Sequence, residues 1–348
     1  MTERIEAYIS PTNFEKDVFK IIEHVRPNWL VDSTSKPLIT IKFTEGTTNT
    51  IFGVRENRSM DDTVLLKLFG TGTDIFIDRD KEVATFIKLQ NAGLGSQLYC
   101  RFENGLAYQY ITGKPLSYSL ATTPKFIEKV TKHMAEWHAL LDVSYTEVSE
   151  EPFIYDKIGN WVEQCKHYPK LMLKYICPDF TVDYEVLKAE FDWMDKNFNR
   201  HSMSCPIVFC HNDILLNNII YDEASDVLRF IDLEYGATNF SAFDLGNYFN
   251  KLCGLGKMDY SRFPKENEQK IYIKEYLSHF NYLIDKHPPT EQEIHAFYID
   301  ANRMSLASLL LWGVWAYIQN SISDIDFDYL DYANYNFSEY FKRKPTIS

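Results

Sequence analysis

Cysteine is scarce in this chain, and no two cysteines are spaced as metal ligands or as a disulfide framework. The 348 residues contain 6 cysteines, scattered without a repeated interval and without a Cys-x-x-Cys pair. A zinc site and a disulfide-stapled fold are therefore not expected, since both need characteristic spacings. Scattered thiols are usually buried and reduced, which favours a cytoplasmic protein.

Long hydrophobic runs are also lacking. The most apolar stretch, residues 304–318, is interrupted and shorter than the roughly 20 residues that cross a bilayer. The first ten residues include Glu3, Arg4 and Glu6 but no apolar core, so no signal peptide is expected. The 24 Phe, 23 Tyr and 6 Trp instead predict a packed globular protein, long enough for two lobes. We expect a soluble protein without membrane insertion.

Basic residues are fewer than acidic residues. The 36 Lys and Arg are outnumbered by 49 Asp and Glu, which leaves a formal net charge of −13. Such a surface argues against nucleic acid as a partner, because phosphates would be repelled. It suits a small cationic substrate, although solubility is the simpler explanation of the excess. Neither internal repeats nor low-complexity segments are present.

Three short apolar segments separated by polar turns lie within residues 207–235, a pattern typical of buried strands. The turn after the first segment carries His211 and Asp213. Asn218 follows five residues after that aspartate, directly before the second segment, and Asp232 ends the third. Carboxylates and an amide at strand ends are what a metal–nucleotide site needs. One aspartate accepts a proton from an attacking hydroxyl, while the asparagine and a second aspartate hold Mg²⁺ on the phosphates.

The first third of the chain predicts a small sheet with two helices. Residues 14–25 have helical apolar spacing, and strands are expected at residues 38–43, 51–54 and 64–69. The small-residue turn 44–50 lies between the first two strands, where backbone N–H groups can approach phosphate oxygens. By itself that turn is weak evidence, because many hairpins look like it.

Lys67 lies inside the third of these strands, and two readings are open. A strand lysine usually points to solvent, but it can bind a nucleotide phosphate if a helix supplies a carboxylate partner. Residues 78–90 predict such a helix, with Glu82 in its early turns. Two further strands are expected at residues 98–102 and 106–111. The segment that follows, residues 109–113, leads out of the sheet and is predicted to be the hinge between two lobes.

The rest of the chain predicts helices. His133 and His138 fall in an amphipathic helix, where packing without ligand duty is the favoured interpretation. Asp244 is expected at a helix start, capping backbone N–H groups and supporting the site. Trp312 and Trp315 are three residues apart and share one helix face. They predict either an aromatic core or a cage that attracts an ammonium group by cation–π interaction.

These motifs together resemble the choline/ethanolamine kinase family. The ordered segments that carry the resemblance are His211-Asn-Asp213, Asn218, Ile231-Asp-Leu-Glu-Tyr235, Phe243-Asp-Leu-Gly-Asn247 and Leu311-Trp-Gly-Val-Trp315. The likeness covers nearly the whole chain. It is closer to the ethanolamine branch, as indicated by Asp78-Arg-Asp80, Asn218-Ile-Ile-Tyr221 and Phe249-Asn250.

The resemblance implies an α+β, two-lobed, protein-kinase-like fold, with a small N-terminal sheet lobe (1–112) and a large, mainly helical C-terminal lobe (113–348). It implies transfer of phosphate from ATP, with Mg²⁺, to ethanolamine, the first step of the CDP-ethanolamine route to phosphatidylethanolamine. The alternative is a choline kinase, or a dual choline/ethanolamine kinase, that makes phosphocholine. A homodimer is also suggested. By motif position the implied residues are the base Asp213, the Mg²⁺ ligands Asn218 and Asp232, the ATP-site residues Thr48, Asn49, Lys67, Glu82, Gln109, Tyr110 and Ile111, and the amine-site residues Trp312, Trp315, Phe327 and Tyr332.

Two supporting positions and one acid complete this set. His211 and Asp244 are expected to hold the catalytic loop, without a proton-transfer role for the histidine. Glu234 is expected to accept a hydrogen bond from the amine, or else to serve the metal. Aminoglycoside kinases and a catalytically dead scaffold are the rival interpretations. A protein kinase is disfavoured, because the Asp-Phe-Gly and Ala-Pro-Glu segments are absent.

Four positions depart from the family pattern. Lys67 stands where many relatives carry Arg, and Tyr248 and Leu309 each stand where His is common. Lys251 replaces an acidic residue of the Gly-Asn-x-Phe-x-Glu pattern. A lysine in place of an acid weakens the electrostatic attraction for a cationic substrate, so amine affinity and selectivity are the properties that this departure affects.

Overall fold

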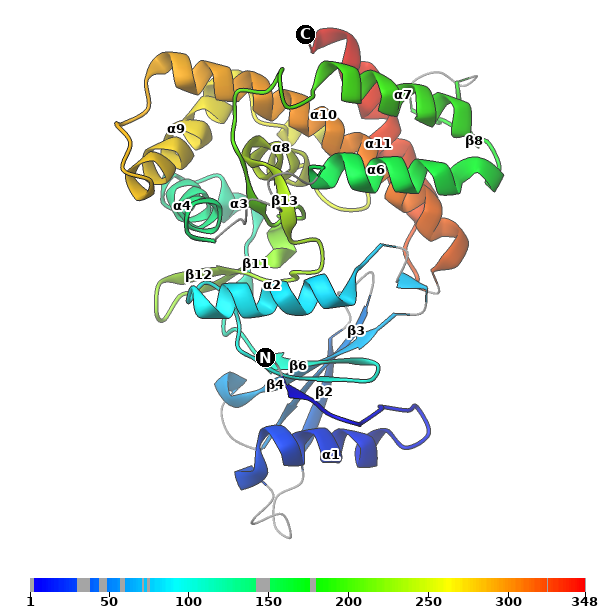
Figure 1. Ribbon diagram of the computed structural model, residues 1–348, viewed down its shortest axis with the longest axis vertical. Helices are drawn as coiled ribbons and strands as arrows, with labels where there is room; N and C mark the ends of the chain where they lie inside the picture. The colour runs from blue at the N-terminus through cyan, green and yellow to red at the C-terminus, as the bar shows by residue number, and fades with distance from the viewer. Residues whose placement is uncertain are drawn as a thin grey trace. The chain divides into compact units, whose positions relative to one another are not determined.

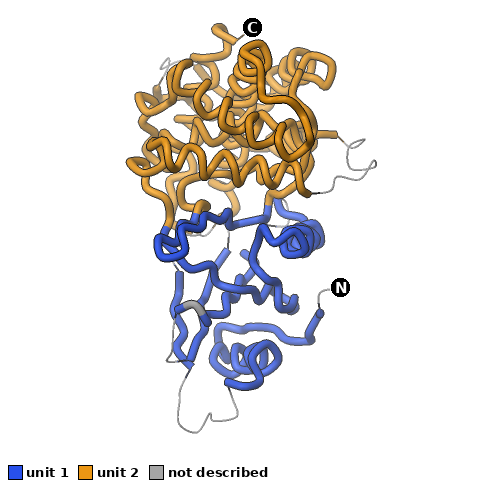
Figure 2. Tube along the Cα trace, turned by 90° about the vertical axis from the view of Figure 1, so that its left-hand side faces the viewer, with its two compact units in different colours: residues 1–114, 220–234 blue, residues 115–219, 235–348 orange. Residues whose placement is uncertain are grey.

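The computed structural model describes residues 3–29, 38–43, 49–56, 60–70, 72–73, 76–141, 151–175, 180–323 and 325–347. The chain divides into two compact units, coloured separately in Figure 2. Unit 1 comprises Met1–Lys114 and Ile220–Glu234, and unit 2 comprises Pro115–Ile219 and Tyr235–Ser348. The expected division was 1–112 and 113–348. In the structure the first boundary follows Lys114, and the chain returns to unit 1 for residues 220–234.

Unit 1 is built on a six-stranded sheet in the order β1-β5-β6-β4-β3-β2. Its strands, in chain order, are β1 (Glu3–Arg4), β2 (Ile39–Phe43), β3 (Asn49–Arg55), β4 (Val64–Phe69), β5 (Leu98–Phe102) and β6 (Gly105–Gln109). The pair β1–β5 is parallel and the other pairs are antiparallel. Short connections account for the antiparallel pairs β2–β3, β3–β4 and β5–β6, since hairpins can join only antiparallel neighbours, whereas β4 and β6 are separated in sequence by α2 and β5.

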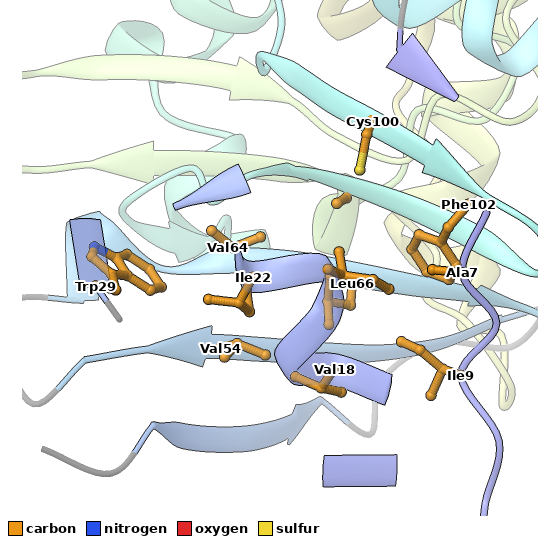
Figure 3. Close-up of a cluster of buried hydrophobic side chains, with 12 residues drawn as sticks. Ala7, Ile9, Val18, Ile22, Trp29, Val54, Val64, Leu66, Cys100 and Phe102 are labelled. Atoms are coloured by element: carbon orange, nitrogen blue, oxygen red, sulfur yellow. The ribbon is translucent and has the colours of Figure 1, made fainter. Parts of the chain in front are cut away.

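Helix α1 (Phe14–Val25) packs on this sheet with one apolar face. Val18, Ile21 and Ile22 are buried at helical spacing and belong to one core cluster with strand residues such as Val54 and Leu66. Figure 3 shows Val18 and Ile22 on the side of the helix that faces these strands. The predicted bounds of α1 and β4 agree with the structure. Helix α2 (Arg79–Asn91) begins after Asp78, whose carboxylate accepts the backbone N–H groups of residues 80 and 81. This capping fixes where α2 starts and hence where Glu82 lies.

The returning segment of unit 1 contains β11 (Ile219–Asp222) and β12 (Val227–Phe230). They form a three-stranded sheet with β7 (Lys114–Pro115) in the order β12-β11-β7. Asp232 follows β12 with a φ of 65°, in the left-handed region that Asp tolerates better than most residues. The third apolar segment predicted from sequence is thus a short strand followed by a sharply turned loop.

Unit 2 is mainly helical and surrounds one long helix, α10 (Glu291–Ile322). Around it lie α4 (Pro124–Leu140), α6 (Phe153–Gln164), α7 (Tyr184–Asn197), α8 (Ser241–Lys251), α9 (Glu266–Leu283) and α11 (Tyr329–Arg343), as Figure 1 shows. Helix α10 contacts α6, α8, α9 and α11, and every residue from 304 to 319 is buried. Its apolar sequence is therefore that of a core helix. Among the described helices, none is long and apolar enough to cross a membrane.

Two features of unit 2 place the site. Strand β10 (Ile207–Cys210) pairs antiparallel with β13 (Ala237–Phe240), a strand that the sequence did not predict. Helix α8 then approaches the backbone of α10 at Gly246. A Cβ added to Gly246 would lie 2.5 Å from the carbonyl oxygen of Ala301, so only glycine permits this approach. The close crossing brings the polar side chains at the end of α8 against the α10 face.

Candidate active site

The lysine of β4 is the centre of a buried charged cluster in unit 1. Lys67 Nζ lies 2.8 Å from Glu82 Oε1, 2.7 Å from Glu234 Oε2 and 3.3 Å from Asp232 Oδ1. The Lys67 side chain is only 3% exposed, so the solvent-facing interpretation is wrong. The strand-lysine and helix-glutamate pair expected from their order in the sequence is present.

Two further residues complete this cluster. Arg79 Nη1 donates to Glu82 (2.9 Å) and Arg79 Nη2 to Asn49 Oδ1 (3.2 Å), while Asn49 Nδ2 donates to Glu234 (2.7 Å). Three carboxylates thus face two cations. Burial by itself lowers the pKa of Lys67, but the neighbouring carboxylates outweigh burial and hold that pKa well above its usual value. Lys67 is therefore charged.

Asp232 differs from the other two carboxylates of the cluster. Its side chain is 36% exposed, whereas those of Glu82 and Glu234 are buried. A part-exposed carboxylate next to a fixed lysine is suited to a ligand that arrives from solvent. Glu234, in contrast, accepts from both Lys67 and Asn49, so the structure assigns its carboxylate to the lysine cluster of unit 1.

The loop of unit 2 that carries Asp213 is held by Asp244 of α8. Asp244 accepts the backbone N–H groups of His211 (2.8 Å) and Asn212 (2.8 Å), and it also contacts His138 Nε2 (3.0 Å). The Asp244 carboxylate therefore binds the loop and does not cap α8, whereas the sequence predicted capping. Asn212 has a φ of 66°, and the two Asp244 contacts stabilise this unusual turn.

The two histidines of α4 and the histidine of the loop serve packing. His138 Nδ1 contacts the Tyr276 hydroxyl (2.8 Å). His211 stacks on Trp137, with ring centroids 5.1 Å apart, and its Nδ1 faces the backbone N–H of Asp213 at 3.3 Å. His133 lies 3.0 Å from Glu136 within its own helix. The packed interpretation of the α4 histidines agrees with these contacts.

His138, Cys210 and Asp244 lie within 4.8 Å of one another, close enough to suggest a metal site. However, both ring nitrogens of His138 have hydrogen-bond partners, and both oxygens of Asp244 accept loop N–H groups. Burial also holds the pKa of the Cys210 thiol well above its usual value, which disfavours the thiolate that a metal needs. We assign this group to support of the loop.

Asp213 itself has two notable neighbours in unit 2. Asn218 Nδ2 donates to the backbone carbonyl of Asp213 at 3.0 Å, which leaves the Asn218 amide oxygen as the atom suited to a metal. Lys251, the last residue of α8, places Nζ 3.6 Å from Asp213 Oδ1. Lys251, which departs from the family pattern, thus lies directly beside the predicted base Asp213.

An aromatic cluster lies next to this lysine. We use that name for Tyr235, Trp312, Trp315, Phe327, Tyr329 and Tyr332, whose rings contact one another at centroid distances of 4.9–5.7 Å. Lys251 Nζ lies 4.2 Å from the Trp312 ring centroid and donates to the Tyr332 hydroxyl at 2.9 Å. The cluster therefore holds an ammonium group in this structure.

Two residues orient the tryptophans, and neither was among the predicted site residues. Asn247 Oδ1 accepts from Trp312 Nε1 (2.8 Å) and from Ser308 Oγ (2.8 Å). The Tyr235 hydroxyl accepts from Trp315 Nε1 (3.0 Å). Both residues belong to motifs quoted above, but a motif does not show which indole a side chain will meet.

The remaining predicted ATP-site residues lie in unit 1. Thr48 is outside the described residues, and Asn49 belongs to the lysine cluster. The backbone N–H groups of Gln109 and Tyr110 donate to the carbonyl oxygens of Gln97 (2.8 Å) and Thr63 (3.2 Å). These two donors are therefore used within unit 1. Ile111 remains as the candidate for the adenine contact among the three residues predicted at the hinge.

A small mixed sheet with a buried lysine–glutamate pair, together with a helical unit that holds an aspartate in a fixed loop, is the organisation of the protein-kinase-like fold. A family model described as choline/ethanolamine kinase matches residues 40–341. The chain belongs to the choline/ethanolamine kinase family.

Individual relatives agree with this assignment. Ethanolamine kinase 2 of Homo sapiens is 33% identical over 343 residues, which cover 98% of this chain and 84% of that protein. Among solved structures, ethanolamine kinase of Plasmodium vivax aligns with a TM-score of 0.78 at 22% identity, over 98% of this chain and 91% of its own. Choline kinase of Cryptosporidium parvum aligns with a TM-score of 0.76 at 22% identity, over 95% of each chain. The two structural likenesses support the fold.

Proposed function

We propose that this protein transfers the γ-phosphoryl group of ATP to the hydroxyl of ethanolamine. One observation carries the proposal. A single ammonium group, that of Lys251, lies 3.6 Å from Asp213 Oδ1 and 4.2 Å from the Trp312 ring centroid. A proton acceptor and a cation-binding aromatic face therefore lie on two sides of one small volume, as an amino alcohol requires.

In this mechanism Asp213 orients the substrate hydroxyl and accepts its proton as the new P–O bond forms. Trp312, Trp315, Phe327 and Tyr332 would contact the amine. The loop contacts of Asp244 and His211 hold the Asp213 carboxylate in place, which reduces the cost of orienting it during the reaction.

The lysine cluster of unit 1 would bind the nucleotide phosphates. Lys67 is charged and fixed by Glu82 and Glu234, and Asn49 lies beside it. The backbone of Ile111 is proposed for the adenine edge. Phosphate oxygens would replace part of the carboxylate contacts of Lys67, and the pair with Glu82 would keep the lysine in position.

The residues proposed as metal ligands fit Mg²⁺ by their chemistry. Asp232 offers a part-exposed carboxylate and Asn218 an amide oxygen, and Mg²⁺ prefers oxygen donors. When bound, the ion neutralises phosphate charge.

Choline is the second candidate acceptor, because an aromatic face binds primary and quaternary ammonium groups alike. A homodimer is proposed from the resemblance, and light scattering would test it.

The deciding experiment is steady-state kinetics with ethanolamine, its N-methylated derivatives and choline, for the wild type and for Asp213→Asn. We expect ethanolamine to give the highest kcat/KM. We expect Asp213→Asn to lower kcat by about 10²–10⁴-fold, the usual contribution of a general base, with nucleotide binding preserved. Near-normal turnover of Asp213→Asn would remove Asp213 from its role, and absence of turnover with every amine would refute the proposed activity.

A further inference from the structure

The ammonium group of Lys251 contacts the aromatic cluster. Its Nζ lies over the Trp312 ring (4.2 Å), within 5.6 Å of the Tyr332 ring centroid, and it donates to the Tyr332 hydroxyl (2.9 Å). Its side chain is 4% exposed. Burial by itself lowers the pKa of Lys251, but Tyr332 and Asp213 outweigh burial, and the net shift is upward. The group is therefore a buried ammonium ion.

A second ammonium in this place would meet a like charge. The Lys251 ammonium already offsets the negative charge of Asp213, so the two side chains together present no net charge to an incoming substrate. Two like charges a few ångströms apart repel each other strongly where water is excluded. In addition, the ring face of Trp312 that would attract a substrate cation is already in contact with Lys251.

We propose that Lys251 is a specificity-determining residue, a tethered ammonium that competes with the ammonium of the substrate for the aromatic cluster. The inference rests on the proposed function in assuming that the cluster receives the amine. Wild-type protein then distinguishes poorly between an amino alcohol and an uncharged alcohol of the same shape. Its KM for amino alcohols is set by the displacement of Lys251 from Trp312.

The test varies the charge at one position and the charge of the ligand. Lys251→Met keeps most of the length of the side chain without charge, and Lys251→Glu reverses the charge. Choline and 3,3-dimethylbutan-1-ol are a ligand pair of the same shape, one cationic and one neutral. Calorimetry or tryptophan fluorescence gives both dissociation constants, and kinetics gives KM and kcat for ethanolamine.

We expect the preference for choline over its neutral analogue to rise at least tenfold from wild type to Lys251→Met, about 1.4 kcal/mol, and further in Lys251→Glu. The KM for ethanolamine should fall in the same order. Lys188→Met is the matched control, because Lys188 is an exposed lysine of α7 paired with Asp192, and it should leave the preference unchanged. Circular dichroism checks that each variant is folded.

The outcomes separate the inference from the proposed function. An unchanged or smaller preference for the cation in folded Lys251→Met and Lys251→Glu would overturn the inference, whatever the turnover. A preference that rises without turnover of any amine would support the competing role of Lys251 and refute the proposed kinase activity. A lower KM together with a higher preference would support both.

Discussion

Removal of the Lys67 ammonium should destabilise unit 1 through repulsion among the carboxylates that remain. Lys67→Met preserves side-chain length but leaves Glu82, Glu234 and Asp232 around a site without its central cation. Each carboxylate lies 2.7–3.3 Å from Nζ. Two like charges about 5 Å apart repel by about 3 kcal/mol at an effective dielectric constant of about 20. Loss of one partner from a buried ion pair typically costs about 3–5 kcal/mol. We expect a loss in this range.

The pH dependence of the variant follows from the same repulsion. Without Lys67, one buried carboxylate of the folded state binds a proton more readily than in the unfolded chain, so its folded-state pKa is raised. Stability that comes from a raised carboxylate pKa is present at low pH and is lost as pH rises through that pKa. The difference between Lys67→Met and wild type should therefore be largest at about pH 8 and smaller at about pH 5.5.

Hydrogen exchange followed by mass spectrometry measures the destabilisation of unit 1 segment by segment. Peptides from β4 and α2 should exchange faster in Lys67→Met, while peptides from α10 in unit 2 serve as an internal reference. Lys42→Met is the control, since Lys42 is an exposed lysine of β2 in the same sheet. Equal exchange in wild type and Lys67→Met at about pH 8 would show that the lysine does not hold the carboxylates together, and would refute the reasoning.

Two further changes test unit 2. Trp312→Ala should raise KM for ethanolamine about tenfold with a smaller effect on kcat, because one cation–π contact contributes about 0.5–2 kcal/mol. An unchanged KM in steady-state assays would assign Trp312 to the core alone. Asp244→Asn replaces a carboxylate that accepts from two loop N–H groups and contacts His138. This substitution should lower the unfolding free energy, measured in urea, by about 1–3 kcal/mol. It should also lower kcat more than it changes KM. An unchanged kcat would mean that Asp244 does not position Asp213.

Local patterns predicted most elements of the fold. The apolar spacing of α1 and the short apolar run of β4 are properties of neighbouring residues, and the predicted bounds of both elements agree with the structure. Order along the chain left the role of Lys67 open, and its pairing with Glu82 was implied by the family resemblance; the structure shows the pair at 2.8 Å. Trp312 and Trp315 were placed on one face because three residues are nearly one helical turn.

Strand β13 and the assignment of residues 220–234 to unit 1 could not be predicted in this way. Ala237–Phe240 has little alternation, and it becomes a strand only because β10 supplies its hydrogen-bond partners. The segment that carries Asp232 and Glu234 follows the loop of Asp213 in sequence, yet it packs with Lys67, about 165 residues away along the chain. Such pairings depend on the closure of long loops, which nearby residues do not determine.

The sequence by itself predicted which chemical groups could form a site: an aspartate proposed as the base, an asparagine and an aspartate proposed as metal ligands, a strand lysine, a helix glutamate, and two tryptophans three residues apart. It also showed that Lys251 departs from the family pattern. Only the tertiary structure decided what that lysine does, because the approach of α8 to α10 at Gly246 places its ammonium between Trp312 and Asp213. Contacts between distant segments arise from packing, and packing fixes which charges meet.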